Sequence, residues 1–473
     1  MLVAKGSGPR TGPTTERTKL LKRFEARIAP NEALDRKLVS FQANRETPFY
    51  GWFKYKEGFS ARLVEYFLGI LGGNPGTLLD PFAGAGSGLF AARDMGWDAV
   101  GIEVLPVGFY SIQARQAAEE VKPGVLAAHI ADAESADFSG HWQEQHAFKH
   151  LTITKGAFPD RNETELVGYV GYCHEHIRNL RVRTLMLYAA FCVLEAISYT
   201  RKDGQYLRWD YRSNRARGSK AFDKGKIQNF RTAVLSKLRQ MLADIGCQRL
   251  FAGERRGAID VTLGSCLDVL PGMRDETTDF VLTSPPYCNR YDYTRTYALE
   301  LMFLGCDQRR INVLRQQMLS CTVENREKYA YLQNAYAQRN QLARWERVDR
   351  VFRRQKALHE VLGVLGEYRE QGLLNNPNIV KMVHNYFYEM CFVIYELARL
   401  LRGGGKAVIV NDNVRYAGEE VPVDLILCDF AENFGLRPRQ IWTLPRGKGN
   451  SSQQMGNHGR TELRKCVYVW EKL

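Results

Sequence analysis

A strand, a glycine-rich turn, a helix and a second strand follow one another between residues 77 and 103. Thr77 to Asp80 is a short apolar strand, residues 80–88 (DPFAGAGSG) form the turn, and residues 89–96 have helical character. Ala99 to Glu103 is a second strand that ends in an acid. A β-α-β unit of this kind joins two parallel strands through a right-handed crossover. It constrains the chain toward an α/β fold.

The same alternation continues after an interruption from about residue 120 to 258. Because helical and strand patterns alternate, we expect one doubly wound, Rossmann-like, mostly parallel sheet with helices on both faces and two insertions. Helix 59–71 precedes the first strand. The later expected elements are strands 259–263 and 279–282, helix 384–402, a stop at Gly403, Gly404 and Gly405, strand 407–410, helix 422–433, and strands 439–444 and 466–470.

The charge balance of the chain points to a polyanionic partner. The 66 Lys and Arg residues against 52 Asp and Glu give a net charge of +14. Such an excess fits a nucleic acid or an acidic membrane surface. The N-terminus lacks the apolar core of a signal peptide, and the longest apolar run, Leu185 to Leu194, is about half of a membrane span. We therefore expect a cytoplasmic protein with no membrane partner.

The ten cysteines contain no Cys-x-x-Cys pair, which is typical of reduced thiols in the cytosol. Cys173, His174 and His176 are too close together for a zinc-finger spacing, and no second pair follows. We expect no metal site.

The glycine turn and Glu103 together favour an adenosyl ligand. A glycine turn lets a ligand approach the backbone at a helix N-terminus, although a turn by itself is often only a tight turn. Neither the G-x-G-x-x-G fingerprint nor the G-x-x-x-x-G-K-[ST] loop is present. Glu103 lies 17 residues after Gly86, roughly where an acid accepts ribose hydroxyls in nucleoside-binding folds.

The segment TSPPY (283–287) directly follows a buried strand. Two prolines remove two N–H donors and leave rigid carbonyl acceptors beside a hydroxyl and an aromatic ring. Ser284 Oγ and the Pro285 carbonyl could accept hydrogen bonds from an exocyclic amine and free its lone pair, while Tyr287 stacks on a base that has left the helix. The alternative is a Pro-Pro turn. No cysteine follows a proline, so the Pro-Cys nucleophile used for methylating a cytosine ring carbon is absent.

These residues resemble the bacterial amino-group DNA methyltransferases of restriction–modification systems. Asp80-Pro81-Phe82-x-Gly84-x-Gly86 is similar to their cofactor motif, and Ser284-Pro285-Pro286-Tyr287 is similar to their catalytic motif. The stretch 49–67 resembles the segment that closes over the methionine end of the cofactor. Residues 385–410 and 466–472 resemble the later helix and strands of the family. The resemblance covers about 40–135, 255–305 and 380–473.

The resemblance implies a seven-stranded methyltransferase fold with an antiparallel last strand, and S-adenosyl-L-methionine as cofactor. It implies a catalytic role for Ser284, Pro285, Pro286 and Tyr287. Ser before Pro-Pro-Tyr leans toward N4 of cytosine, whereas Asp or Asn leans toward N6 of adenine. The family usually has Gly-Asp after the third strand, where this chain has Gly264-Ser265 and then Asp268. The implied cofactor-binding residues are Phe59, Asp80, Pro81, Phe82, Gly84, Gly86, Glu103, Ser265 and Asp268.

Residues 201–231 carry ten Lys and Arg against three Asp, which is half of the excess charge, and aromatic residues are interleaved. Basic side chains can hold phosphates and aromatic rings can stack on bases, although a solvated basic face is the alternative. The loop 444–460 could close on DNA or act as a connector. The expected DNA-binding residues are Arg201, Lys202, Arg208, Trp209, Arg212, Arg215, Arg217, Arg446 and Lys448.

We therefore expect a site-specific DNA methyltransferase that acts on double-stranded DNA, most readily at N4 of cytosine. Such an enzyme would share its site with a cognate restriction endonuclease, without direct contact. An N6-adenine enzyme, an RNA base methyltransferase and a non-catalytic DNA-binding protein are the alternatives. The expected organisation is a basic N-terminal arm (1–40), three catalytic parts (41–135, 256–305 and 381–473), a candidate target-recognition insertion (136–255) and a helical insertion (306–380).

Overall fold

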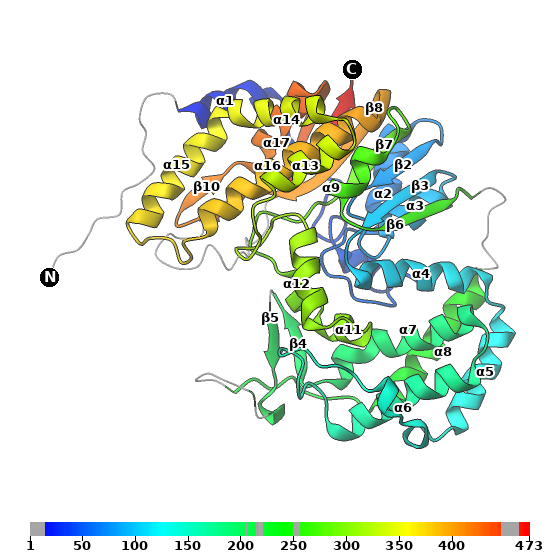
Figure 1. The fold of residues 1–473 in the computed structure, drawn as a ribbon. Helices are drawn as coiled ribbons and strands as arrows, with labels where there is room; N and C mark the ends of the chain where they lie inside the picture. The colour runs from blue at the N-terminus through cyan, green and yellow to red at the C-terminus, as the bar shows by residue number, and fades with distance from the viewer. Residues whose placement is uncertain (1–14, 205, 214, 216–220, 249–255, 446–462) are drawn as a thin grey trace.

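The computed structural model describes residues 15–204, 206–213, 215, 221–248, 256–445 and 463–473. A twisted sheet with its helices forms the upper half of the molecule in Figure 1, and a mostly helical lobe lies below it. Within the described ranges, no helix combines the length and apolar character that a membrane span requires.

The central sheet has eight strands in the order β1-β11-β12-β8-β7-β2-β3-β6. All neighbours are parallel except β12, which is antiparallel to both β8 and β11. The α/β class and the antiparallel last strand are thus confirmed. The strands are β1 (Ile28–Pro30), β2 (Thr77–Asp80), β3 (Asp98–Glu103), β6 (Ile259–Leu263), β7 (Thr278–Thr283), β8 (Leu401–Asp412), β11 (Leu436–Thr443) and β12 (Lys465–Lys472).

The expected number of seven strands is wrong by one. The added strand, β1, comes from the segment that we assigned to an N-terminal arm, and Ile28–Pro30 pairs in parallel with residues 441–443 at the sheet edge. Its three residues are too short for an alternating pattern to be visible, so the pairing depends on tertiary contact.

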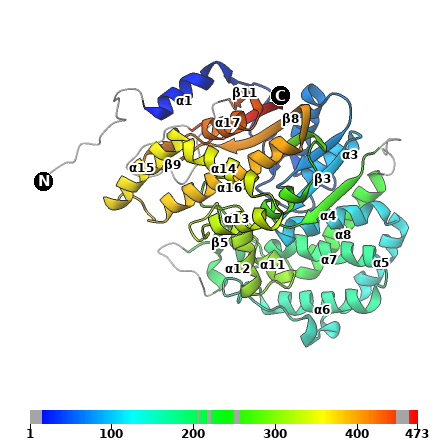
Figure 2. The same cartoon turned by 45° about the horizontal axis from the view of Figure 1, so that its top comes forward.

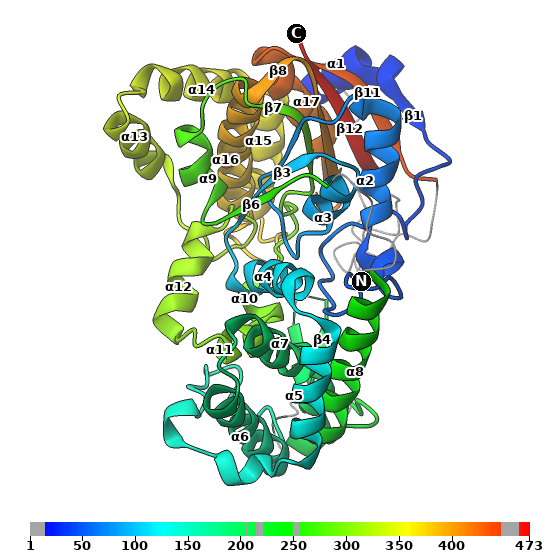
Figure 3. The same cartoon turned by 90° about the vertical axis from the view of Figure 1, so that its right-hand side faces the viewer.

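Helices cover both faces of the sheet because the strand side chains alternate. Leu79 and Val281 point into a core shared with α1 (Glu16–Phe24), α16 (Ile379–Leu400) and α17 (Val423–Asn433). Leu78 and Phe280, one residue earlier on each strand, point into the opposite core with α2 (Ala61–Phe67) and α3 (Ser87–Asp94). Ser60 caps α2 by accepting the Leu63 amide. Figure 3 shows the helices of the two layers, α16 and α17 in one and α2 and α3 in the other.

Residues 104–248 build the lower lobe. Its helices are α4 (Pro106–Glu120), α5 (Pro123–Ser135), α6 (Asp160–His176), α7 (Leu180–Ile197) and α8 (Phe230–Gln248). The apolar run 185–194 lies in α7, where it packs against α4 and α8 in a core separate from those of the sheet. A hairpin of β4 (Thr200–Asp203) and β5 (Tyr206–Trp209) projects from the lobe.

The second insertion is helical, as expected, and packs on the sheet half. It contains α12 (Gln308–Gln317), α13 (Tyr329–Gln338), α14 (Leu342–Arg354) and α15 (Lys356–Glu370), preceded by α10 (Tyr293–Thr296) and α11 (Ala298–Phe303). Trp345, Val348 and Phe352 recur at helical spacing and bury one face of α14 in the core that contains α16. Helix α12 crosses between the two halves of the molecule (Figures 1 and 2).

The triplet Gly403-Gly404-Gly405 does not separate a helix from a strand as expected. Helix α16 already ends at Leu400, and β8 begins at Leu401. Thr278 pairs with Leu401 and Phe280 with Lys406, so residues 402–405 are accommodated as an irregularity within β8. Gly404 has φ of +77°, which L side chains rarely adopt. The remaining short elements are α9 (Cys266–Val269), β9 (Val414–Tyr416) and β10 (Glu419–Val421).

Candidate active site

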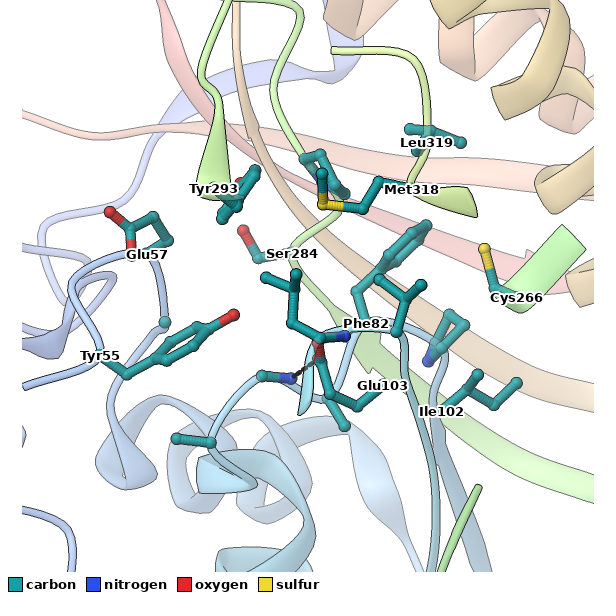
Figure 4. A pocket seen from close by; sticks show the side chains of 18 of the residues that line it. Tyr55, Glu57, Phe82, Ile102, Glu103, Cys266, Ser284, Tyr293, Met318 and Leu319 are labelled. Atoms are coloured by element: carbon teal, nitrogen blue, oxygen red, sulfur yellow. Dashed lines mark hydrogen bonds between the residues drawn. The ribbon is translucent and has the colours of Figure 1, made fainter. Parts of the chain in front are cut away.

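An open cleft of about 800 Å³ lies at the carboxyl ends of β2, β3, β6 and β7. This is the edge where doubly wound sheets bind ligands. Figure 4 shows that Tyr55, Glu57, Tyr293 and Ser284 gather at one end of the cleft, while Cys266, Met318 and Leu319 lie toward the other end and Glu103 projects between the two groups.

The glycine turn brings the backbone close to the cleft. Gly84 and Gly86 have φ of +54° and +80°, so the turn needs residues without a side chain. A Cβ on Gly108 would lie 2.4 Å from the Gly84 carbonyl oxygen, and one on Gly84 would lie 2.9 Å from the Tyr55 ring. A side chain at either position would clash with neighbouring protein atoms, so the turn packs closely with only backbone at these points, and Gly84 lines the cleft before the start of α3.

Glu103 ends β3 with its carboxylate fixed by two backbone amides. Gly84 N donates to Oε2 at 2.6 Å and Leu105 N donates to Oε1 at 2.7 Å. Each oxygen retains a further lone pair. Burial raises the pKa of Glu103 to about 8, although the two amide hydrogen bonds oppose that rise. The carboxylate lines the cleft as a fixed acceptor for ligand hydroxyls.

Asp80 connects the cofactor motif to the catalytic motif. Its Oδ1 accepts the Thr283 hydroxyl at 2.6 Å and the Phe82 amide at 3.1 Å. Among the described residues, its Oδ2 is buried with no hydrogen-bond partner, and burial raises the pKa of Asp80 to about 7. Asp80 lies behind the cleft, and its bond to Thr283 fixes the residue that precedes Ser284.

The tetrapeptide 284–287 presents two of its residues to the cleft, Ser284 and Pro286, while Pro285 is buried. The Ser284 hydroxyl lies 3.5 Å from that of Tyr287. Tyr287 itself does not line the cleft, whereas the rings of Tyr55 and Tyr293 do. Tyr55 stacks on the buried Tyr297 with ring centroids 5.1 Å apart. The Tyr287 stacking role thus stays a prediction, and two further rings are available.

The other expected cofactor residues divide into two groups. Ser265 contributes to the cleft, but Asp268 lines a neighbouring cavity, where Tyr331 donates to its carboxylate. Gly86 shapes the turn without lining the cleft. The expected residues that line the cleft are Phe59, Pro81, Phe82, Gly84, Glu103 and Ser265.

Sequence reasoning missed several residues that line the cleft. Tyr55 and Glu57 lie in the stretch 49–67, whose resemblance could have pointed to them. Tyr291 and Tyr297 donate their hydroxyl hydrogens to the Glu57 carboxylate. The helical insertion also contributes Gln317, Met318 and Leu319 to the cleft. Its polar, helical sequence gives no indication that these residues line a binding site.

The expected DNA-binding residues that the structure describes lie on the hairpin β4–β5 and on the segment that follows it. Arg201 and Arg208 are cross-strand partners and are exposed, with Arg208 stacked over Phe222 at 4.2 Å. Arg215 covers Trp209 at 4.5 Å, and Arg212 forms a two-pronged pair with Asp210 at 2.6 and 2.8 Å. Arg217, Arg446 and Lys448 lie outside the described residues.

The expectation that Lys202 binds DNA is wrong. Its side chain is 2% exposed, and its ammonium pairs at 2.5 Å with Glu300, which is 1% exposed. In an alternating strand, Lys202 faces inward while Arg201 faces solvent. Breaking this buried pair would leave an uncompensated charge, so Lys202 holds the hairpin in place.

Cys173, His174 and His176 do not form a cluster around a common point. Cys173 is fully buried, and burial raises the pKa of its thiol. His174 stacks on His146. His176 instead lies near His141 and Glu175, whose ligand atoms and its own fall within 4.8 Å of one another. His141 Nδ1 is already 2.7 Å from the Glu175 carboxylate, and His176 Nδ1 is 3.2 Å from the Tyr172 carbonyl.

This chain is an α/β protein of the methyltransferase class, as its sheet with the reversed strand β12, its glycine turn, Glu103 and the tetrapeptide together indicate. No protein-family model matches the chain. The chain is 44% identical over 459 residues to the Type II methyltransferase M.AvaI of Nostoc sp. strain PCC 7120, an alignment that covers 96% of this chain and 92% of the relative, and the M.AvaI of Anabaena variabilis gives the same values. It is 40% identical over 474 residues to the Type II methyltransferase M.BsoBI of Geobacillus stearothermophilus, covering 97% and 92%. The chain belongs to this family of bacterial Type II methyltransferases, and the resemblance is confirmed.

Proposed function

We propose that this protein is a site-specific DNA methyltransferase of a restriction–modification system. It transfers a methyl group from S-adenosylmethionine to an exocyclic base amine, with N4 of cytosine favoured. The observation that carries this proposal is that Glu103 and Ser284 line the same cleft, while the Asp80–Thr283 hydrogen bond connects their motifs. The family membership supports the reaction class.

The residues that line the cleft offer the hydrogen-bond acceptors and apolar surfaces that S-adenosylmethionine requires. The Glu103 carboxylate, already fixed by two amides, has lone pairs for both ribose hydroxyls. The turn at Gly84 approaches the ligand without a side chain, and Phe59 and Phe82 contribute apolar walls. Gly264 and Ser265 also line the cleft, and neither supplies an acid for the adenine. The cofactor supplies an electrophilic methyl group, and the protein positions the acceptor.

The tetrapeptide accepts the target amine. Ser284 Oγ, which lines the cleft, takes one amine hydrogen, and the carbonyl of the adjacent Pro285, which does not itself line the cleft, takes the other. These two hydrogen bonds draw the nitrogen lone pair out of conjugation with the ring. The Ser284 hydroxyl is directed toward Tyr287 and so keeps its lone pairs for the amine. Direct displacement at the methyl carbon then requires alignment and polarisation more than a nucleophilic side chain.

The choice between cytosine and adenine rests on Ser284. In amino-group methyltransferases, Ser at this position leans toward cytosine N4, whereas Asp or Asn leans toward adenine N6. The N6-adenine enzyme is therefore the second candidate. An RNA base methyltransferase would use the same tetrapeptide, and a non-catalytic DNA-binding protein would not need the cleft.

Double-stranded DNA is the proposed substrate, and the hairpin β4–β5 is the proposed contact. The exposed pair Arg201 and Arg208 supplies phosphate-binding charge, and Trp209 and Arg215 provide a stacked surface. Arg212 is held by Asp210 and shapes the segment that follows the hairpin. A cognate endonuclease would act on the same DNA sequence, in the cytoplasm where the host DNA lies.

The test is to express the protein in a host that lacks base methylation and to sequence its DNA with a readout for modified bases. The expected result is N4-methylcytosine at one fixed position of one short recurring sequence. N6-methyladenine at such a site would favour the second candidate. Unmodified DNA together with methylated tRNA would refute the DNA substrate.

A further inference from the structure

Three elements meet at Glu57, at the target-base end of the cleft. Tyr291 and Tyr297, which follow the tetrapeptide, donate their hydroxyl hydrogens to the Glu57 carboxylate, one to each oxygen. The Tyr291 hydroxyl also lies 3.1 Å from the Gly204 carbonyl oxygen in the turn of the hairpin β4–β5. We call the contacts among Glu57, Tyr291, Tyr297 and Gly204 the Glu57 clamp.

Two further contacts bind strand β4 of the hairpin, close to its turn, to the same wall. Lys202 is buried against Glu300, and its ammonium lies 4.6 Å from the centre of the Tyr297 ring. Lys56, the neighbour of Glu57, donates its ammonium hydrogen to the Lys202 carbonyl. The hairpin that exposes Arg201 and Arg208 is therefore attached to the cleft wall by side chains that face inward.

The position of the clamp relates the hairpin to the target base. Glu57 and Tyr293 line the cleft with Ser284 (Figure 4), and Tyr293 packs edge-on against Tyr291 at 5.0 Å. A shift of the hairpin moves Gly204, and through Tyr291 it moves the wall beside Ser284. Displacing a target amine by about 1 Å can cost on the order of 10²-fold in rate, so this wall needs a fixed position.

We propose that Glu57 is a positioning residue that couples DNA contact at the hairpin to the alignment of the extruded base with Ser284. The proposal rests on the proposed DNA methyltransferase function. Both Glu57 oxygens accept from tyrosines, so the proposed role of its carboxylate is to hold these two rings in place. Tyr291 carries the coupling, because its one hydroxyl hydrogen has two acceptors within reach, the Glu57 carboxylate and the Gly204 carbonyl of the hairpin.

The test compares Tyr291→Phe, Glu57→Gln and the double variant with the wild-type enzyme. Tyr291→Phe removes one hydroxyl and keeps the ring. Tyr169→Phe is the matched control, because it removes a buried hydroxyl that donates to the Met186 carbonyl at 2.9 Å in the core of the lobe. The measurements are DNA affinity, cofactor affinity, the single-turnover methylation rate and the fluorescence of 2-aminopurine at the target position.

The expected result is a split between binding and turnover. Tyr291→Phe should keep DNA and cofactor affinities within about twofold, lower the methylation rate by roughly 10- to 100-fold and weaken the 2-aminopurine signal. The double variant should be no slower than the slower single variant, because both changes break one hydrogen-bonded unit. Tyr169→Phe should leave all four measurements unchanged.

Two outcomes overturn the proposal while the function stands. A Tyr291→Phe enzyme with the wild-type rate and 2-aminopurine signal would remove the clamp from the reaction. Independent, multiplicative rate losses in the double variant would show that Glu57 and Tyr291 do not act together. A wild-type enzyme that methylates no DNA would instead refute the proposed function, and the clamp proposal with it.

Discussion

At the scale of single residues, the proposed cofactor-binding role of Glu103 leads to a prediction about pH. Its carboxylate is 4% exposed, and burial raises its pKa to about 8. To accept two ribose hydroxyls, the carboxylate must be ionised, so below pH 8 binding must also remove a proton. The ionised form gains hydrogen-bond donors when the ligand binds, which offsets the desolvation that raises the pKa.

The first prediction is that cofactor affinity rises with pH between 6 and 7.5. One proton released on binding gives a change of about tenfold per pH unit below the pKa. Calorimetry in buffers of different ionisation enthalpy would measure both the affinity and the proton released. Glu103→Gln, which cannot ionise, should bind roughly tenfold or more weakly and show a flatter profile. A wild-type affinity that does not change over this range would contradict the assignment.

The second prediction concerns Ser284. Ser284→Ala removes one acceptor and leaves the Pro285 carbonyl, so the single-turnover methylation rate should fall on the order of 10²-fold while DNA and cofactor remain bound. Ser135→Ala is the control, because the exposed Ser135 hydroxyl donates to the Asp132 carbonyl in its own helix. Methylation by Ser284→Ala at the wild-type rate would show that the tetrapeptide is only a turn that ends a strand.

The third prediction compares the aromatic rings beside Ser284. Tyr293 lines the cleft and Tyr287 does not, although the Tyr287 hydroxyl lies near that of Ser284. If the extruded base stacks on the ring that lines the cleft, Tyr293→Ala should weaken 2-aminopurine fluorescence more than Tyr287→Ala does. The reverse order would return the stacking role to Tyr287, as the sequence motif indicates.

At the scale of elements, the sequence pattern predicted strands of the central sheet well, but it did not predict the polar hairpin β4–β5. Strand β2 spans Thr77–Asp80, as expected, because a short apolar run between turn residues is typical of a buried strand. Strand β6 spans Ile259–Leu263, also as expected, but it is a partly exposed edge strand whose residues alternate between apolar and polar. The hairpin β4–β5 was missed, since Thr200-Arg201-Lys202-Asp203 has no apolar alternation. Without that strand, the inward direction of Lys202 could not be predicted.

The fourth prediction belongs to this hairpin. Arg201→Ala with Arg208→Ala should weaken DNA binding and lower the slope of log affinity against log salt by up to about 2, since each phosphate contact contributes about 0.9. Cofactor affinity should not change. Arg239→Ala is the control, because this exposed arginine on α8 of the lobe pairs with Glu134 on α5. An unchanged affinity and slope in the double variant would make the hairpin a solvated basic face.

At the scale of the whole molecule, the cleft depends on segments that are distant in sequence. The motifs near residues 80 and 284 meet because β2 and β7 pair in parallel, and the β-α-β pattern made that meeting predictable. The wall made by Met318 and Leu319 was not predictable. It depends on the buried pair of Lys328 and Glu389, which fixes the helical insertion against α16 at 2.9 Å. Such a pairing depends on tertiary structure and leaves no local pattern.

The most direct test of the central claim is to incubate duplex DNA with the protein and S-adenosylmethionine carrying an isotopically labelled methyl group. The DNA is then digested, and its nucleosides are identified by mass spectrometry. The account predicts labelled N4-methylcytosine, and only trace amounts with Ser284→Ala. Label at the C5 carbon of cytosine, or no labelled nucleoside from DNA that the protein binds, would contradict it.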